Sequence, residues 1–187
     1  MDASEREAAV TLARQSLEKW VKERKRPAAG KLPAAFGEKH GCFVTLRKAG
    51  ELRGCIGFPE PVLPLAEAIC EAAKEASEDP RFPPIRPDEL KEITIEVSVL
   101  TVPVLFKGKR EALPKTIKIG KDGLIIRSGY MSGLLLPQVA TEWGFGPEEF
   151  LDQACIKAGL QAGAWMDKQT EVLIFQAEVF SEEEKLE

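Results

Sequence analysis

The order hairpin, helix, strand occurs twice along this chain, and that repetition limits the possible folds more than any other feature of the sequence. In the first half, residues 42–47 and 52–57 alternate in polarity on either side of a turn at 48–51, which predicts a β-hairpin. A helix is expected to begin near Pro64, and residues 93–100 form the clearest strand of the chain. Isoleucine and valine occupy one face of that strand, and the other face carries Thr94, Glu96 and Ser98.

The second half shows the same order of elements. Residues 116–119 and 124–127 flank a turn at 120–123 whose Asp-Gly pair is a strong hairpin signal. A helix over 147–158 and a strand over 172–180 follow. Hairpins joined to later strands favour an antiparallel or mixed sheet over a doubly wound parallel one, so the predicted fold class is α+β.

Composition places the chain among ordinary globular proteins. Its 187 residues, 44% hydrophobic and 30% charged, suffice for a single domain, or for one domain with two lobes at about 1–105 and 106–187. A net charge of −4 argues against a general nucleic-acid binder. Residues 1–7 are charged where a signal peptide needs an apolar run, and no apolar stretch approaches the roughly 20 residues that cross a bilayer. We therefore expect a cytoplasmic protein that binds neither nucleic acid nor membrane.

The cysteines and the single histidine argue against a metal centre. No two of the four cysteines, at positions 42, 55, 70 and 155, have zinc-knuckle or Cys-x-x-Cys spacing, so free thiols in a reducing compartment are expected. His40 stands alone, which excludes sites built from several histidines. We expect no metal and no cofactor. The absence of asparagine, together with 13 prolines, is typical of a thermophile's protein.

Arg53 and Cys55 are the first candidates for chemistry. Residues two apart on a strand point to the same face, and a neighbouring cation favours the thiolate form of cysteine. Gly54 and Gly57 remove side chains beside them, which lets a ligand or another backbone approach closely.

The hairpin register decides whether Cys55 is a reactive thiol or a core residue, and the sequence leaves both alternatives open. If Arg47 pairs with Leu52 in a symmetric hairpin, Cys55 lies on the apolar face of residues 44 and 46. A shift of one residue places it with Phe43 and Thr45 instead.

Further polar residues group with this hairpin as a candidate site. Arg81 occupies a loop stiffened by prolines at 80, 83 and 84, while Glu96 and Ser98 project from the polar face of their strand. Gln138 follows Pro137 in the second half. These groups would suit a small anionic or carboxylate-bearing ligand. Alternatively, Glu96 forms an ion pair with Arg53 or Arg81 that only stabilises the sheet.

Residues 52–57, Leu-Arg-Gly-Cys-Ile-Gly, resemble the signature of the AMMECR family. The resemblance continues in the right order over nearly the whole chain, through residues 41–46, 79–82, 95–100, 132–140 and 157–160, with Trp165. It implies a single AMMECR-type domain over 1–187, with two similar repeats joined into one barrel-like sheet with flanking helices. It also implies an association, by gene neighbourhood or fusion, with Memo-like proteins and radical SAM enzymes, and thus shared work on a modification pathway.

Two hypotheses of function follow. The first is a binding or adaptor domain in which the hairpin around Arg53 and Gly57 is a rigid docking surface, with Gly54, Arg81, Ser98 and Gln138 as further contacts. The alternative is an enzyme that acts on a small anionic or carboxylate-bearing substrate. In it Cys55 is the nucleophile or a covalent carrier, Arg53 lowers its pKa or holds an anion, and Glu96 is a general base or an orienting carboxylate. The oligomeric state does not follow from the sequence.

Overall fold

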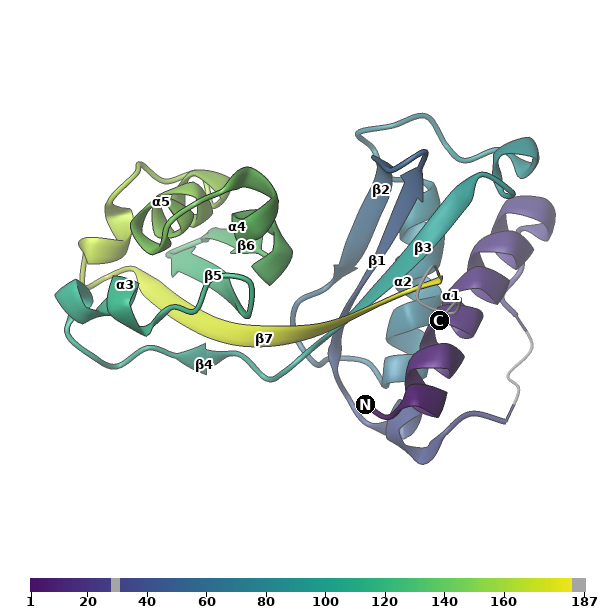
Figure 1. The fold of residues 1–187 in the computed structure, drawn as a ribbon, viewed down its shortest axis with the longest axis horizontal. Helices are drawn as coiled ribbons and strands as arrows, with labels where there is room; N and C mark the ends of the chain where they lie inside the picture. Colours follow the sequence, from purple (N-terminus) through teal and green to yellow (C-terminus); the bar gives the residue numbers. More distant parts are fainter. Residues whose placement is uncertain (28–30, 183–187) are drawn as a thin grey trace. The chain divides into compact units, whose positions relative to one another are not determined.

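The computed structural model describes residues 1–27 and 31–182, which divide into two compact units (Figure 1). Unit 1 contains residues 1–100 together with the segment that begins at Glu178, and unit 2 contains residues 101–177. No helix in the described part of the chain is both long enough and apolar enough to cross a membrane.

Unit 1 is a sheet with two helices on one of its faces. Strand β1 (Gly41–Lys48) pairs antiparallel with β2 (Glu51–Phe58) on one side and with β3 (Ile93–Leu100) on the other. Helix α2 (Leu65–Ser77) packs on β1 and β2, and α1 (Ala3–Glu23) packs on α2 and β3. Ala68, Ala72, Ala73 and Ala76 of α2 are buried, because small side chains let the helix backbone approach the sheet.

The start of α1 differs in detail from the sequence pattern. Ser4 and Glu7 have the spacing of a capping box, but the residues that form one are Asp2 and Glu5. Asp2 accepts the backbone N–H of Glu5 at 2.8 Å, and Glu5 accepts the N–H of Asp2 at 2.9 Å.

The β1–β2 hairpin contains a bulge that decides which residues face each other. Ala49 and Gly50 both have positive φ, at 51° and 82°, as a tight two-residue turn requires. Arg47 pairs with Leu52 next to this turn, but Leu46 already pairs with Gly54, so Arg53 is the extra residue of a β-bulge. From there on the register is shifted by one residue.

Unit 2 repeats the strand topology of unit 1. Strand β5 (Asp122–Ser128) pairs antiparallel with β6 (Met131–Leu135) and with β7 (Glu171–Ser181), and the short β4 (Val104–Leu105) also pairs with β7. Helices α3 (Leu113–Thr116), α4 (Pro137–Trp143) and α5 (Pro147–Lys157) bury apolar residues against these strands.

The hairpin predicted around residues 120–123 is wrong, and the real one lies one element later. A strand was expected over 116–119, but α3 ends at Thr116 and residues 117–119 form no strand. Asp122 accepts the N–H of Lys118 at 2.9 Å and closes a compact loop in which Gly120 has a φ of +78°. The partner of β5 is therefore β6, across a turn at residues 129 and 130.

The strand order β2-β1-β3-β7-β5-β6 has the same pattern when it is read from either end. In each half, the first strand of a hairpin lies between its hairpin partner and the strand that follows the helix. All pairings described above are antiparallel. The predicted fold class is therefore confirmed: α+β, with two similar hairpin-helix-strand repeats, one antiparallel sheet and flanking helices.

Candidate functional site

The bulge places Cys55 on the face of the unit 1 sheet that the helices do not cover. Cys55 pairs with Thr45 across β2 and β1, and Thr45 pairs with Glu96 across β1 and β3. The opposite face carries the core positions, including Val44 and Leu46, which are fully buried. Two registers were considered for Cys55. Next to the turn the hairpin has the register in which Arg47 pairs with Leu52, but beyond the bulge it has the other register, in which Cys55 pairs with Thr45. We call the row Cys55, Thr45 and Glu96, together with Arg47 and Arg81, the Cys55 face.

Side-chain contacts link this row directly. Thr45 Oγ1 donates a hydrogen bond to Cys55 Sγ at 3.2 Å. Arg47 Nε donates to Glu96 Oε1 at 2.7 Å in a partly buried ion pair. The prediction that Glu96 pairs with Arg53 or Arg81 is therefore wrong. Arg47 pairs with Glu96 because it lies two residues after Thr45 on β1 and so points to the same face of the sheet. Thr45 is directly opposite Glu96 on β3, which makes Arg47 the diagonal neighbour of Glu96.

Asp79 and Arg81 bind the main chain of Cys55 on β2, which is the first strand in the order of the sheet and therefore an edge strand. The N–H of Cys55 donates to Asp79 Oδ2 at 2.9 Å, and Arg81 Nη2 donates to the carbonyl oxygen of Cys55 at 3.2 Å. Arg81 also donates to Asp79, from Nη2 to Oδ2 at 2.6 Å and from Nε to Oδ1 at 3.0 Å. The loop thus satisfies the main-chain groups of an edge strand as a further strand would.

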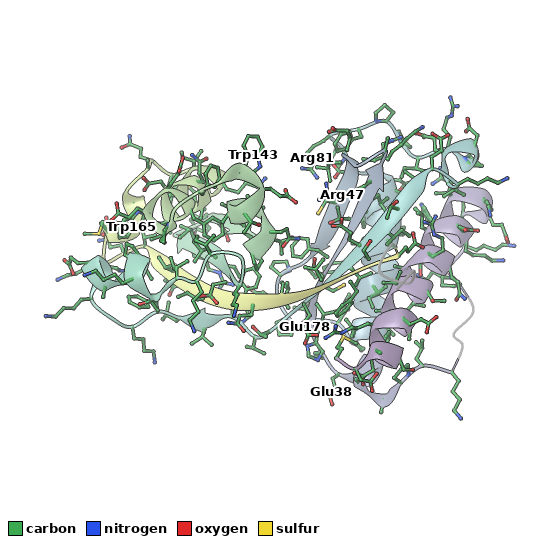
Figure 2. All side chains as sticks on the ribbon, in the orientation of Figure 1. Glu38, Arg47, Arg81, Trp143, Trp165 and Glu178 are labelled. Atoms are coloured by element: carbon green, nitrogen blue, oxygen red, sulfur yellow. The ribbon has the colours of Figure 1, made fainter. Side chains whose placement is uncertain are left out.

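This arrangement changes the ionisation of Asp79. The hydrogen bond from Arg81, helped by the backbone N–H groups of Cys55 and Arg81, lowers the pKa of Asp79 to about 2 although burial opposes the shift. The Asp79 carboxylate is therefore charged at neutral pH, and the same pairing raises the pKa of Arg81. Figure 2 shows Arg47 and Arg81 at the same end of this sheet.

Arg53 anchors a loop and is not directed at the thiol. Its Nη2 and Nε donate to Glu89 at 3.1 and 3.3 Å, and its Nη1 donates to the carbonyl oxygen of Pro83 at 2.8 Å. The hydrogen bond from Arg53 lowers the pKa of Glu89. The cation that acts on Cys55 is Arg81. The bulge explains this, because it breaks the alternation on which the expected Arg53–Cys55 pair depended.

The thiol of Cys55 is not activated. Burial raises its pKa, and this outweighs the lowering by the hydrogen bond from Thr45 and by the charge of Arg81. Burial also raises the pKa of Cys42, Cys70 and Cys155, and all four cysteines are free. The protonated thiol is the form of Cys55 at neutral pH.

Gly54 and Gly57 serve close backbone packing. A Cβ added to Gly54 would lie 2.2 Å from the carbonyl oxygen of Ala76 on α2, and one added to Gly57 would lie 2.1 Å from the carbonyl oxygen of Cys42. Both glycines are therefore required by the neighbouring helix or strand, whether or not a ligand approaches them.

The two remaining candidates lie in different units. Ser98 is fully buried in β3 opposite Phe43, and its Oγ has no hydrogen-bond partner among the described residues. Gln138 lies in the first turn of α4 in unit 2, and its Oε1 also lacks a described partner. In residues 1–27 and 31–182, no three histidine, cysteine or acidic side chains gather where they could hold a metal ion.

Thr45 and Asp79 both contact Cys55, but neither was among the candidate site residues predicted from the sequence. Asp79 could have been found as a carboxylate two residues before Arg81 in a proline-stiffened loop. The position of Thr45 opposite Cys55 depends on the register of the hairpin, which no local sequence pattern reveals.

Comparison with known proteins agrees with this fold. The AMMECR1 family model matches residues 10–180. Protein TK0174 of Thermococcus kodakarensis is 51% identical over 182 residues, covering 93% of this chain and 88% of its own length. A protein of Methanothermobacter thermautotrophicus is 49% identical over 177 residues, covering 93% and 92%.

A solved structure has the same fold. The crystal structure of the uncharacterized protein PH0010 from Pyrococcus horikoshii superimposes with a TM-score of 0.95 at 46% identity, covering 98% of this chain and 94% of that one. The α+β chain with its doubled topology belongs to the AMMECR1 family. The relatives named come from thermophilic archaea.

Proposed function

We propose that this protein is a binding domain whose Cys55 face holds a carboxylate or another small anionic group of its ligand. The observation that carries the proposal is the Asp79–Arg81 pair. Asp79 is almost fully buried and holds Nε and Nη2 of Arg81, while the Arg81 side chain remains 50% exposed. Its Nη1 donates to no described residue. A guanidinium fixed in this way loses little conformational entropy when it binds an anion.

The rest of the Cys55 face suits binding better than catalysis. The Cys55 thiol is protonated at neutral pH and accepts a hydrogen bond from Thr45, and Glu96 is held by Arg47. The alternative, an enzyme with Cys55 as nucleophile and Glu96 as general base, has less support, because a nucleophile needs the thiolate and a base needs a free carboxylate.

We place the protein in the cytoplasm, where a reducing environment keeps cysteines as the free thiols found here. The resemblance to the AMMECR family favours a Memo-like protein or a radical SAM enzyme as the partner that presents the anionic group.

Titration of the isotope-labelled full chain with glutamate and citrate, followed by amide chemical shifts, tests the site. We expect saturable shifts at Cys55 and Arg81 that disappear in Arg81→Ala. Arg86→Ala is the matched control, because Arg86 is an exposed arginine of the same loop that pairs with its neighbour Asp88. Absence of shifts at millimolar ligand, or equal loss in both variants, would contradict the proposal.

Co-purification with the Memo-like and radical SAM proteins encoded in the same genome tests the partner. Complex formation should be lost in Arg81→Ala and retained in Arg86→Ala. Retained binding in both variants would remove the Cys55 face from the interface.

A further inference from the structure

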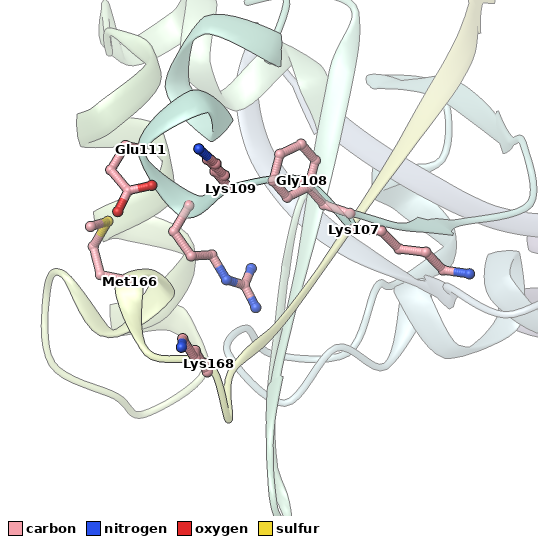
Figure 3. Close-up of a pocket in the computed structure, with 8 residues that line it drawn as sticks. Lys107, Gly108, Lys109, Glu111, Met166 and Lys168 are labelled. Atoms are coloured by element: carbon pink, nitrogen blue, oxygen red, sulfur yellow. The ribbon is translucent and has the colours of Figure 1, made fainter.

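A cavity of about 670 Å³ lies within unit 2, where residues 106–111 approach the segment around Met166 and Lys168 (Figure 3). Residues 106–111 lead from β4 towards α3, and Met166 ends a short 3₁₀ turn that precedes β7. Small-molecule sites in proteins have volumes of roughly 300–1,000 Å³, so the cavity is large enough for a ligand of that class.

The charge of the cavity is opposite to that of the whole protein. Its lining includes the cations Lys107, Lys109, Arg110 and Lys168, and Glu111 is the one acidic side chain among the described residues that line it. In the chain that the structure describes, none of these four cations forms an ion pair. Cations gathered around one hollow repel each other, in a protein whose net charge is −4. An anion in the cavity would relieve this repulsion.

Arg110 is held in place with an unused donor. Its Nη2 donates to the carbonyl oxygen of Thr170, which fixes the guanidinium. Its Nη1 is buried and has no hydrogen-bond partner among the described residues. Because a buried donor without an acceptor costs free energy, a ligand oxygen that reaches Nη1 after a small shift of the neighbouring side chains would contribute to binding.

The cavity also has an apolar side. Phe106 and Met166 belong to its lining, and Figure 3 shows Met166 beside Glu111, with Lys109 and Lys168 also bordering the hollow. An aromatic ring and a flexible thioether are suited to contact with a flat or apolar group. The anionic ligand should therefore carry such a group.

We propose that this cavity is a binding site for a small molecule that carries a phosphate or pyrophosphate group and an aromatic part. Several cations and a fixed guanidinium suit the multiple oxygens of a phosphate better than a single carboxylate. The site is built from unit 2 alone and is independent of the binding function proposed for the Cys55 face.

Calorimetric titration of the full chain at low ionic strength with ADP, inorganic pyrophosphate and adenosine tests the proposal. We expect ADP and pyrophosphate to bind, ADP to bind more tightly, and adenosine to show no binding. Raising the salt concentration should weaken both, because screening reduces the attraction of exposed charges. Failure of both ADP and pyrophosphate to bind at millimolar concentration would overturn the proposed site. Equal affinities for ADP and pyrophosphate would show that the site does not recognise the aromatic part of the ligand.

Two pairs of variants separate a specific site from general charge. The double variant Lys109→Gln and Lys168→Gln should weaken ADP binding by about tenfold or more. The control is Lys115→Gln with Lys121→Gln, which removes the same charge from unit 2 outside the cavity lining. Equal weakening in both double variants would overturn the proposal. Arg110→Gln should abolish binding, and its melting curve shows whether the variant is folded.

Discussion

Asp79 accepts the backbone N–H of Cys55 at 2.9 Å, so a carboxylate from a loop takes the place of a neighbouring strand beside the bulged hairpin. The same carboxylate holds Arg81, which binds the carbonyl oxygen of Cys55. The position of Arg81, on which the proposed binding function depends, is therefore coupled to the backbone of Cys55.

The first prediction concerns Asp79 and pH. Because folding lowers its pKa from an ordinary value near 4 to about 2, the ionised carboxylate stabilises the native state above pH 4, and this contribution is lost as pH falls towards 2. Asp79→Asn should lower the free energy of unfolding at pH 7 by about 2 kcal/mol, and the difference from wild type should shrink between pH 4 and pH 2. Denaturant unfolding across that range measures it. Asp88→Asn, at an exposed ion pair, is the control, and a difference for Asp79→Asn that does not change with pH would contradict the assignment.

The second prediction concerns the reactivity of Cys55. Its raised pKa means that iodoacetamide should alkylate Cys55 more slowly in the native protein than in the unfolded chain at pH 8. Thr45→Val removes the hydrogen bond that lowers the pKa, so the native rate should fall further. Mass spectrometry of the Cys55 peptide gives the rates, with Cys55→Ser as the blank. A native rate above the unfolded rate would revive the nucleophile hypothesis.

The third prediction tests the close packing at Gly54. A Cβ at this position meets the carbonyl oxygen of Ala76 at 2.2 Å, so Gly54→Ala requires α2 to move away from β2. We expect a loss of about 1–3 kcal/mol in the free energy of unfolding. Gly37→Ala is the matched control, since an added Cβ there meets nothing within 4 Å. Equal stability of the two variants would show that the packing tolerates the methyl group.

The fourth prediction concerns the anchor between Arg53 and Glu89. Both side chains are largely buried and share two hydrogen bonds. A double-mutant cycle of Arg53→Ala and Glu89→Ala should give a coupling free energy of about 1–3 kcal/mol. The same cycle for the exposed pair Arg86 and Asp88 should give a much smaller coupling free energy, because water screens exposed charges. Similar values for both pairs would argue against an anchoring role for Arg53.

The fifth prediction is thermal stability. The chain has no asparagine, and the relatives named come from thermophilic archaea. Differential scanning calorimetry should give a melting midpoint above about 70 °C, beyond the usual mesophilic range. A midpoint of about 45–65 °C would contradict the thermophile hypothesis.

Local patterns predicted the elements well where one face of a strand or helix is strongly apolar. The strand predicted at 93–100 is β3 with the same bounds, and the helix and strand predicted at 147–158 and 172–180 are α5 and β7 to within one residue. The prediction failed around residues 116–123, because the Asp-Gly pair closes a loop after α3. A turn signal identifies where the chain reverses, but it does not identify which strands pair.

The sequence by itself determined the family, the α+β class and the doubled order of elements, because these depend on periodicity and motifs that can be read within short windows. Only the tertiary structure decided the face of Cys55 and the partners of Arg53, Arg81 and Glu96. One bulged residue shifts the register of β2, and a shift of one residue moves a side chain to the opposite face of the sheet. Arg81, Arg53 and Arg47 reach partners that lie 26, 36 and 49 residues away along the chain. Such contacts form only when a loop and three strands are brought together.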